Sequence, residues 1–152
     1  MDTSRLSRSE YIAVAGAILL VIALFLPWYE TNPDNTAANI DGERGTFSGW
    51  DVHPIVFWLL LLLAVSPVIL AWIIARGYEL AWVRGELTAV GAIFGLGLVF
   101  FNGIVSKPGE PSGQISLKYG YWLTLFAILL ILVGSVMRTG ETERRRRPPG
   151  TF

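Results

Sequence analysis

The side chains best suited to acid–base chemistry or metal binding lie in one polar stretch. They are five acids and the single histidine: Glu30, Asp34, Asp41, Glu43, Asp51 and His53. The spacing of Asp51 and His53 would allow an acid–base pair. Asp41-Gly42-Glu43 matches only part of a calcium-binding loop, because the alternating oxygen ligands are missing. We interpret the stretch as a solvated acidic loop. Phe47, Trp50, Asp51 and His53 are its candidate anchors or partner contacts.

Composition excludes several other chemistries. The chain contains no cysteine, which excludes disulfides, thiolate metal sites and cysteine nucleophiles. A single histidine excludes the usual cluster of several histidines around a metal. The 12 basic residues equal the 12 acidic residues, so no excess of positive charge favours nucleic acid. We therefore predict no metal, no cofactor and no nucleic-acid partner.

The elements that must position these residues are four apolar segments. The windows 11–29, 52–75, 87–106 and 119–137 hold 82 of the 152 residues and no Asp, Glu, Lys or Arg. About 20 helical residues at about 1.5 Å each cross a bilayer core of about 30 Å. The chain is 53% hydrophobic and only 16% charged, whereas soluble domains are about 25% charged. This pattern excludes a soluble enzyme domain and a disordered chain, and it predicts an all-α membrane protein, a four-transmembrane-helix bundle.

The segments between the windows predict the organisation of the chain. The predicted membrane domain covers 1–138, with helices at about 11–28, 54–75, 87–105 and 119–137, outer loops 29–53 and 106–118, and an inner loop 76–86. Residues 46–50 and 114–118 have the composition of short strands, which would add a small extracytoplasmic cap. The tail, 139–152, is polar, and we expect it to be disordered.

Small and polar residues in the predicted helices indicate where helices pack. Gly91 and Gly95 lie four apart on one face of the third helix, in a stripe that continues to Asn102. The stripe would meet either a second subunit or the first or fourth helix of the same chain, where Gly16 offers a small partner. We favour the contact within the chain. Asn102 is expected to bond between helices, and Pro67 to kink the second helix.

The distribution of arginine predicts the orientation. Nine of the 12 basic residues fall on the side of the termini and the inner loop, whereas Arg44, Lys107 and Lys118 fall on the other. The positive-inside rule then places both termini in the cytoplasm. The first apolar run lacks a nearby cleavage site, so we expect a retained helix rather than a signal peptide. The basic run of the tail is a candidate contact for anionic lipid headgroups: Arg144, Arg145, Arg146 and Arg147.

Two short motifs resemble those of small, uncharacterised four-span membrane proteins of actinobacterial type: Leu26-Pro27-Trp28-Tyr29 and Ser48-Gly49-Trp50-Asp51. The resemblance covers most of the chain. It implies a bacterial cytoplasmic membrane protein and no particular activity. The architecture is also similar to that of the claudin-type tetraspans, whose tryptophan after the first helix and loop Gly-Leu-Trp are echoed by Trp28 and Gly49-Trp50. The cysteines that close that loop in claudins are absent here.

Three functions remain open at this point. The first is a non-enzymatic accessory, scaffold or assembly protein, with the lipid bilayer and another membrane protein or a second copy as partners. The second is a subunit of a small channel or transporter, which would need Ser66, Asn102 and Thr124 along a polar path. The lack of acids and bases in the windows argues against an ionisable relay in such a transporter. The third is a membrane enzyme that uses the outer-loop acids.

Overall fold

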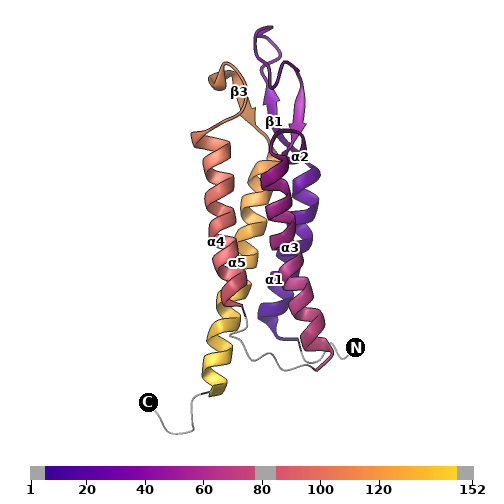
Figure 1. Cartoon of the computed structure of the whole chain (residues 1–152), viewed down its shortest axis with the longest axis vertical. Helices are drawn as coiled ribbons and strands as arrows, with labels where there is room; N and C mark the ends of the chain where they lie inside the picture. Colours follow the sequence, from indigo (N-terminus) through magenta and orange to yellow (C-terminus); the bar gives the residue numbers. More distant parts are fainter. Residues whose placement is uncertain (1–5, 78–84, 147–152) are drawn as a thin grey trace.

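Four long helices run side by side and carry a small sheet at one end (Figure 1). The computed structural model describes the backbone of residues 6–77 and 85–146 and the side chains as far as residue 141. The elements are α1 (Arg8–Phe25), β1 (Pro27–Thr31), β2 (Thr46–Ser48), α2 (Gly49–Val52), α3 (Pro54–Ala75), α4 (Glu86–Phe100), the π-helix η2 (Phe101–Val105), the 3-10 turn η3 (Ser112–Gln114), β3 (Ile115–Leu117) and α5 (Tyr119–Arg146). The prediction of four long helices in a mainly helical chain is confirmed.

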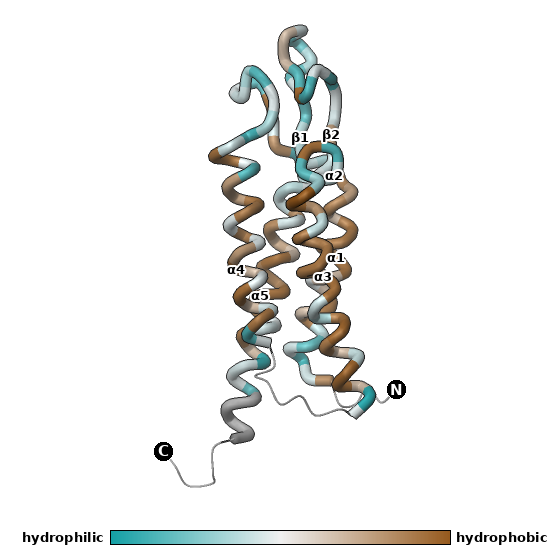
Figure 2. Tube along the Cα trace, viewed as in Figure 1, coloured by the Kyte–Doolittle hydropathy of each residue, from teal (hydrophilic) through white to brown (hydrophobic). Residues whose placement is uncertain are grey.

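Four helical segments are long and apolar enough to cross a membrane: Arg8–Phe25, Pro54–Ala75, Glu86–Val105 and Tyr119–Glu141. Figure 2 shows the hydrophobic residues along these helices and the hydrophilic ones mainly in the connections at the sheet end and toward the opposite end. Large apolar side chains point outward from every helix, among them Ile22, Leu62, Phe94 and Phe126. The helices are therefore apolar on their outer as well as their inner faces, as in helices surrounded by lipid.

The closest helix pair is α1 with α5. A Cβ placed on Gly16 of α1 would lie 2.9 Å from the backbone oxygen of Ala127 and 2.9 Å from the backbone nitrogen of Ile131. A Cβ on Gly134 of α5 would lie 2.7 Å from the backbone oxygen of Ser9. Such distances are available only to glycine, so the two backbones approach each other through these two residues.

The pair α3 and α4 meets through side chains instead. A Cβ on Gly91 would lie 3.3 Å from Leu63, and one on Gly95 would lie 3.1 Å from Leu63 and 3.3 Å from Leu60. The two glycines of this stripe therefore face mainly the second long helix rather than the predicted first or fourth. The fourth helix contributes Ile128, whose methyl group would lie 3.8 Å from a Cβ on Gly95.

Pro67 lies buried within α3 and cannot donate a backbone hydrogen bond to Leu63. The hydroxyl of Ser66 donates to that carbonyl oxygen at 2.9 Å instead. The carbonyl freed by the proline is therefore satisfied within the helix, which a helix in an apolar environment requires. The same segment of α3 then provides Leu63 for contact with α4.

The first helix is shorter at its C-terminal end than predicted. It ends at Phe25, and Pro27 and Trp28 begin β1 rather than closing the helix. The sheet has the order β2-β1-β3, and both neighbours are antiparallel to β1. A strand was not expected here because an apolar run of helical length continues into it. We call residues 27–53 and 106–118 the cap, since they stand together on the sheet end of the bundle (Figure 1).

Other boundaries also differ from the predictions. The predicted strand 46–50 divides into β2 and the short helix α2, whereas β3 lies within the predicted 114–118. The third long helix begins at Glu86 and becomes a π-helix after Phe100. The tail was expected to be disordered from residue 139, but α5 continues to Arg146. Glu and Arg are good helix formers, which accounts for the extension. Residues 147–152, and 78–84 of the predicted inner loop, lie outside the described residues.

Candidate functional site

The cap is fixed to the bundle by the aromatic residues of β1. Trp28 and Tyr29 are almost completely buried. The indole Nε1 of Trp28 donates to the backbone oxygen of Ala23 at 2.9 Å, and its ring meets that of Tyr121 edge to face at 6.0 Å. A Cβ on Gly49 would lie 2.8 Å from the Trp28 ring, so only glycine fits there. The cap and the helices therefore share one core.

A polar contact under the cap brings three segments together. The hydroxyl of Tyr29 lies 3.1 Å from Nε2 of His53 and donates to the backbone oxygen of Asn102 at 3.4 Å. Asn102 lies in the π-helix η2, a form that often marks functional positions. Burial lowers the pKa of His53, and burial, then the charge of Tyr121, raises the pKa of Tyr29. Both side chains are therefore favoured in their neutral forms.

Asn102 contributes to this contact through its backbone, contrary to the prediction. Its side-chain nitrogen donates to the oxygen of Leu98 in the same helix at 2.9 Å. The bond to another segment is the one that its carbonyl accepts from Tyr29. The prediction that the Asn102 side chain bonds between helices is therefore wrong.

The acid–base pair suggested by Asp51 and His53 is not formed. The carboxylate of Asp51 accepts hydrogen bonds from the backbone nitrogen of Ser48 at 2.8 Å and from its hydroxyl at 2.7 Å. This is the capping box that begins α2. His53 faces Tyr29 instead. The two residues that sequence spacing suggested as partners therefore have separate structural roles.

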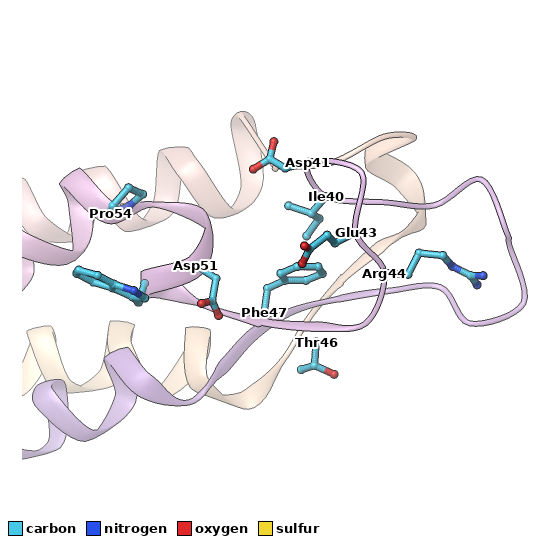
Figure 3. Close-up of a pocket in the computed structure, with 9 residues that line it drawn as sticks. Ile40, Asp41, Glu43, Arg44, Thr46, Phe47, Asp51 and Pro54 are labelled. Carbon is cyan, nitrogen blue, oxygen red and sulfur yellow. The ribbon is translucent and has the colours of Figure 1, made fainter.

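An open groove of about 670 Å³ runs along the cap beside β2 (Figure 3). We call it the cap groove, and it is lined by Ile40, Asp41, Glu43, Arg44, Thr46, Phe47, Trp50, Asp51 and Pro54. Trp50 packs edge to face on Phe57 and Trp58 at the start of α3, with ring centroids 4.7 and 5.8 Å apart. Phe47 is partly buried against the core. Three of the four candidate anchors, Phe47, Trp50 and Asp51, thus line one concave surface.

A second polar cluster lies at the opposite end of the bundle. Glu10 of α1 and Arg138 of α5 are both buried, with Oε1 and Nε 3.8 Å apart. Beside them, the buried hydroxyl of Ser9 donates to Glu141 at 3.0 Å. Sequence reasoning missed this cluster because Glu10 and Arg138 stand just outside the charge-free windows. Their positions at facing ends of two helices, 128 residues apart, became apparent only in the fold.

The three polar residues required for a channel are each bonded within their own helix. Thr124 donates to the backbone oxygen of Gly120 at 2.9 Å, as Ser66 and Asn102 do to Leu63 and Leu98. Ser66 also lies 3.4 Å from the hydroxyl of Thr88 on α4. Large apolar side chains fill the surrounding core, among them Leu20, Leu60, Ile128 and Ile131. The channel hypothesis stays a prediction.

The four arginines predicted to contact lipid headgroups lie at the end of the described chain. Arg144, Arg145 and Arg146 are in the last turns of α5, but their side chains are outside the described part, and Arg147 is outside it entirely. Within the described residues, no group of three or more His, Asp or Glu could hold a metal ion.

No protein-family model, no curated protein and no solved structure matches the chain.

Proposed function

We propose that the chain is an integral membrane protein that crosses the bilayer four times and acts as a non-enzymatic accessory, scaffold or assembly protein. The observation that carries the membrane assignment is the outward apolar surface of four helices of sufficient length. In water, a surface of this extent would be a strong liability for aggregation, whereas in lipid it is the ordinary condition of a helix.

The proposed orientation places the cap outside and both termini in the cytoplasm of a bacterial cell. The support is the excess of arginine at the end opposite the cap, where α1 begins and α5 ends. Resemblance to actinobacterial four-span proteins supports the assignment to the bacterial cytoplasmic membrane.

The proposed role follows from where the concave and polar surfaces lie. Large apolar side chains fill most of the described interior of the bundle, and Asp51 of the cap binds Ser48 rather than His53. The cap groove is a concave surface outside the apolar belt, held rigidly by the packing of Trp28. A rigid cap on a membrane bundle suits recognition of another protein better than chemistry or transport.

Single cysteines test the orientation, because the native chain contains none. A Cβ on Gly113 in the cap or on Gly140 near the opposite end meets no atom within 4 Å, so both positions accept the change. In spheroplasts, a membrane-impermeant maleimide should label Gly113→Cys at once and Gly140→Cys only after lysis. Labelling of both variants, or of Gly140→Cys alone, would contradict the proposed topology.

Site-specific photo-crosslinking in native membranes tests the accessory role. With p-benzoylphenylalanine at Phe47 in the cap groove, we expect an adduct with one other protein of defined mass. The matched position is Phe94, which points outward from α4 and should yield lipid adducts. A cap variant that crosslinks to no protein would be evidence against a partner at this surface.

A further inference from the structure

We propose that the cap groove binds an extended, basic segment of a partner protein. This inference deepens the proposed function and rests on it, since it names the kind of partner that an accessory cap would recognise. The groove has a charge, a shape and an apolar wall that together fit a polypeptide strand with lysine or arginine side chains.

The charge of the groove is negative. Asp41, Glu43 and Asp51 contribute three carboxylates, against one guanidinium from Arg44. Arg44 is directed away, because it donates to the backbone oxygen of Pro33 at 3.0 Å (Figure 3). Asp41 and Glu43 are exposed, and their carboxylates form no hydrogen bond or ion pair with any described residue. These two carboxylates are therefore available to a basic ligand.

The shape of the groove suits an extended chain. One wall is formed by Thr46 and Phe47 of β2, and β2 is an edge strand because β1 lies between it and β3. An exposed sheet edge can accept a further strand from another protein. Successive side chains of such a strand alternate, so every second one could face the carboxylates. The open groove has a volume of about 670 Å³.

The apolar wall is provided by Phe47 and Trp50. Trp50 is 43% exposed even though one side of its ring packs on Phe57. The aliphatic part of a lysine or arginine can pack along such rings, while its charge reaches the carboxylates. The wall is also rigid, because the capping box between Ser48 and Asp51 fixes the turn that carries Trp50.

The opposite wall is a tight turn. Asp41 and Gly42 both have positive φ, 52° and 84°, between Ile40 and Glu43, which exchange backbone hydrogen bonds at 2.9 Å. Ile40 is buried and anchors the turn in the core. The turn thus fixes the backbone that carries Asp41 at its tip and Glu43 at its base, so the two carboxylates start from defined positions on one wall of the groove.

Peptide binding to the full chain in phosphatidylcholine nanodiscs tests the proposal. The probe is a fluorescent eight-residue peptide of alternating lysine and threonine, followed by anisotropy, and the same peptide with glutamate in place of lysine is the control ligand. We expect the lysine peptide to bind and the glutamate peptide not to bind. The double variant Asp41→Asn with Glu43→Gln should weaken binding by tenfold or more. The matched variant Asp34→Asn removes an exposed cap acid outside the groove and should change binding less than twofold.

Trp50→Ala provides a second measurement that does not change charge. It should weaken binding of the lysine peptide about fivefold while the helical circular dichroism stays unchanged. Equal binding to the double variant and to the native chain would overturn the proposal, and so would equal binding to nanodiscs without protein. Binding of a soluble ammonium headgroup to the groove, together with no binding of the lysine peptide, would also overturn it by assigning the groove to lipid. The cysteine labelling above reads the topology independently, so failure here is distinguishable from failure of the proposed function.

Discussion

Two of the helix pairs in the bundle, α1 with α5 and α3 with α4, use glycine in different ways. Between α1 and α5, a Cβ on Gly16 or Gly134 would collide with backbone atoms at 2.7–2.9 Å. Between α3 and α4, a Cβ on Gly91 or Gly95 would meet the methyl groups of leucine side chains at 3.1–3.3 Å. A leucine tip can change its rotamer, whereas a helix backbone can move only as a unit. The first pair is therefore the rigid one.

This difference shows the limit of a small-residue motif. The regular Gly91-x-x-x-Gly95 spacing marks the more tolerant interface, and the glycines of the rigid interface are not spaced four apart. A Cβ on Gly120 of α5 would lie 2.5 Å from the backbone oxygen of Pro27, just past the end of α1. Gly120 and Gly134 are 14 residues, about four helical turns, apart, so both face the same side of α5. The consequence of a glycine depends on whether backbone or side chain lies opposite, and that is a property of the fold.

The largest expected effect concerns the buried ion pair of α1 and α5. Glu10→Ala leaves Arg138 buried without this carboxylate and should lower the free energy of unfolding by about 3 kcal/mol. The measurement is denaturation with SDS, followed by circular dichroism. The exposed Glu86→Ala is the matched control, expected within about 0.5 kcal/mol of the native chain. If Glu10→Ala and Arg138→Met together cost as much as the sum of the single variants, the pair is not coupled.

Gly16→Ala should come next, since the added methyl must displace the backbone of α5. We expect a loss of about 2 kcal/mol, within the range for overpacked sites. Gly97 of α4 is the control, because a Cβ there meets no atom within 4 Å. The same denaturation measurement applies, and equal stability of Gly16→Ala and Gly97→Ala would show that the α1–α5 interface is not the rigid one.

Gly95→Ala should have a smaller effect, below about 1 kcal/mol, because Leu60 and Leu63 can shift by a few tenths of an ångström. Replacing both Gly91 and Gly95 by leucine exceeds that tolerance and should disrupt folding or assembly. Thermal unfolding in detergent, with size-exclusion chromatography for the oligomeric state, checks both results. Our ranking of the two interfaces is wrong if Gly95→Ala is more damaging than Gly16→Ala.

The smallest expected effect is a pH dependence of the folding stability, caused by the contact between Tyr29 and His53. Tyr29 follows α1 and His53 precedes α3, so their bond at 3.1 Å links the rigid pair to the tolerant pair. The pKa of His53 is lowered in the folded state, so below a pH of about 6.5 the unfolded chain binds more protons. The contribution of neutral His53 to the folding stability is then fully present above that pH and is lost as the pH falls.

His53→Gln should remove this component of the pH dependence. The measurement compares the Tm of the native chain and of the variant at pH 7.5 and pH 5.5 in the same detergent. The Tm of the native chain should fall more from pH 7.5 to pH 5.5 than the Tm of the variant does. An identical change in both proteins would mean that the contact between Tyr29 and His53 does not sense pH.

Helix content could be predicted from the sequence because it depends on runs of apolar residues. The residues expected for the second helix, 54–75, are those of α3, where Pro54 stands at the first helical position. The end of the first helix could not be predicted in the same way, because the sheet determines it. Pro27 to Thr31 leave the helix to pair with β2 and β3, whose residues are distant in sequence.

The candidate site could also be predicted only in part from the sequence. Phe47, Trp50 and Asp51 were singled out from residue type, and they line the cap groove. The spacing of Asp51 and His53 allowed an acid–base pair as an alternative to a solvated loop, whereas in the structure Asp51 binds Ser48 and His53 lies beside Tyr29. A spacing of two residues says nothing about which way each side chain turns at a helix start.

The length of α5 has a consequence beyond the bundle. The helix still contacts α1 at Glu141, which accepts a hydrogen bond from Ser9, and it continues for five more residues, from 142 to 146. At about 1.5 Å each, these residues form a projection of about 7.5 Å. That distance is close to the Debye length of about 8 Å at physiological ionic strength. In a membrane, the end of α5 would therefore stay within the range at which the charge of the lipid surface acts on it.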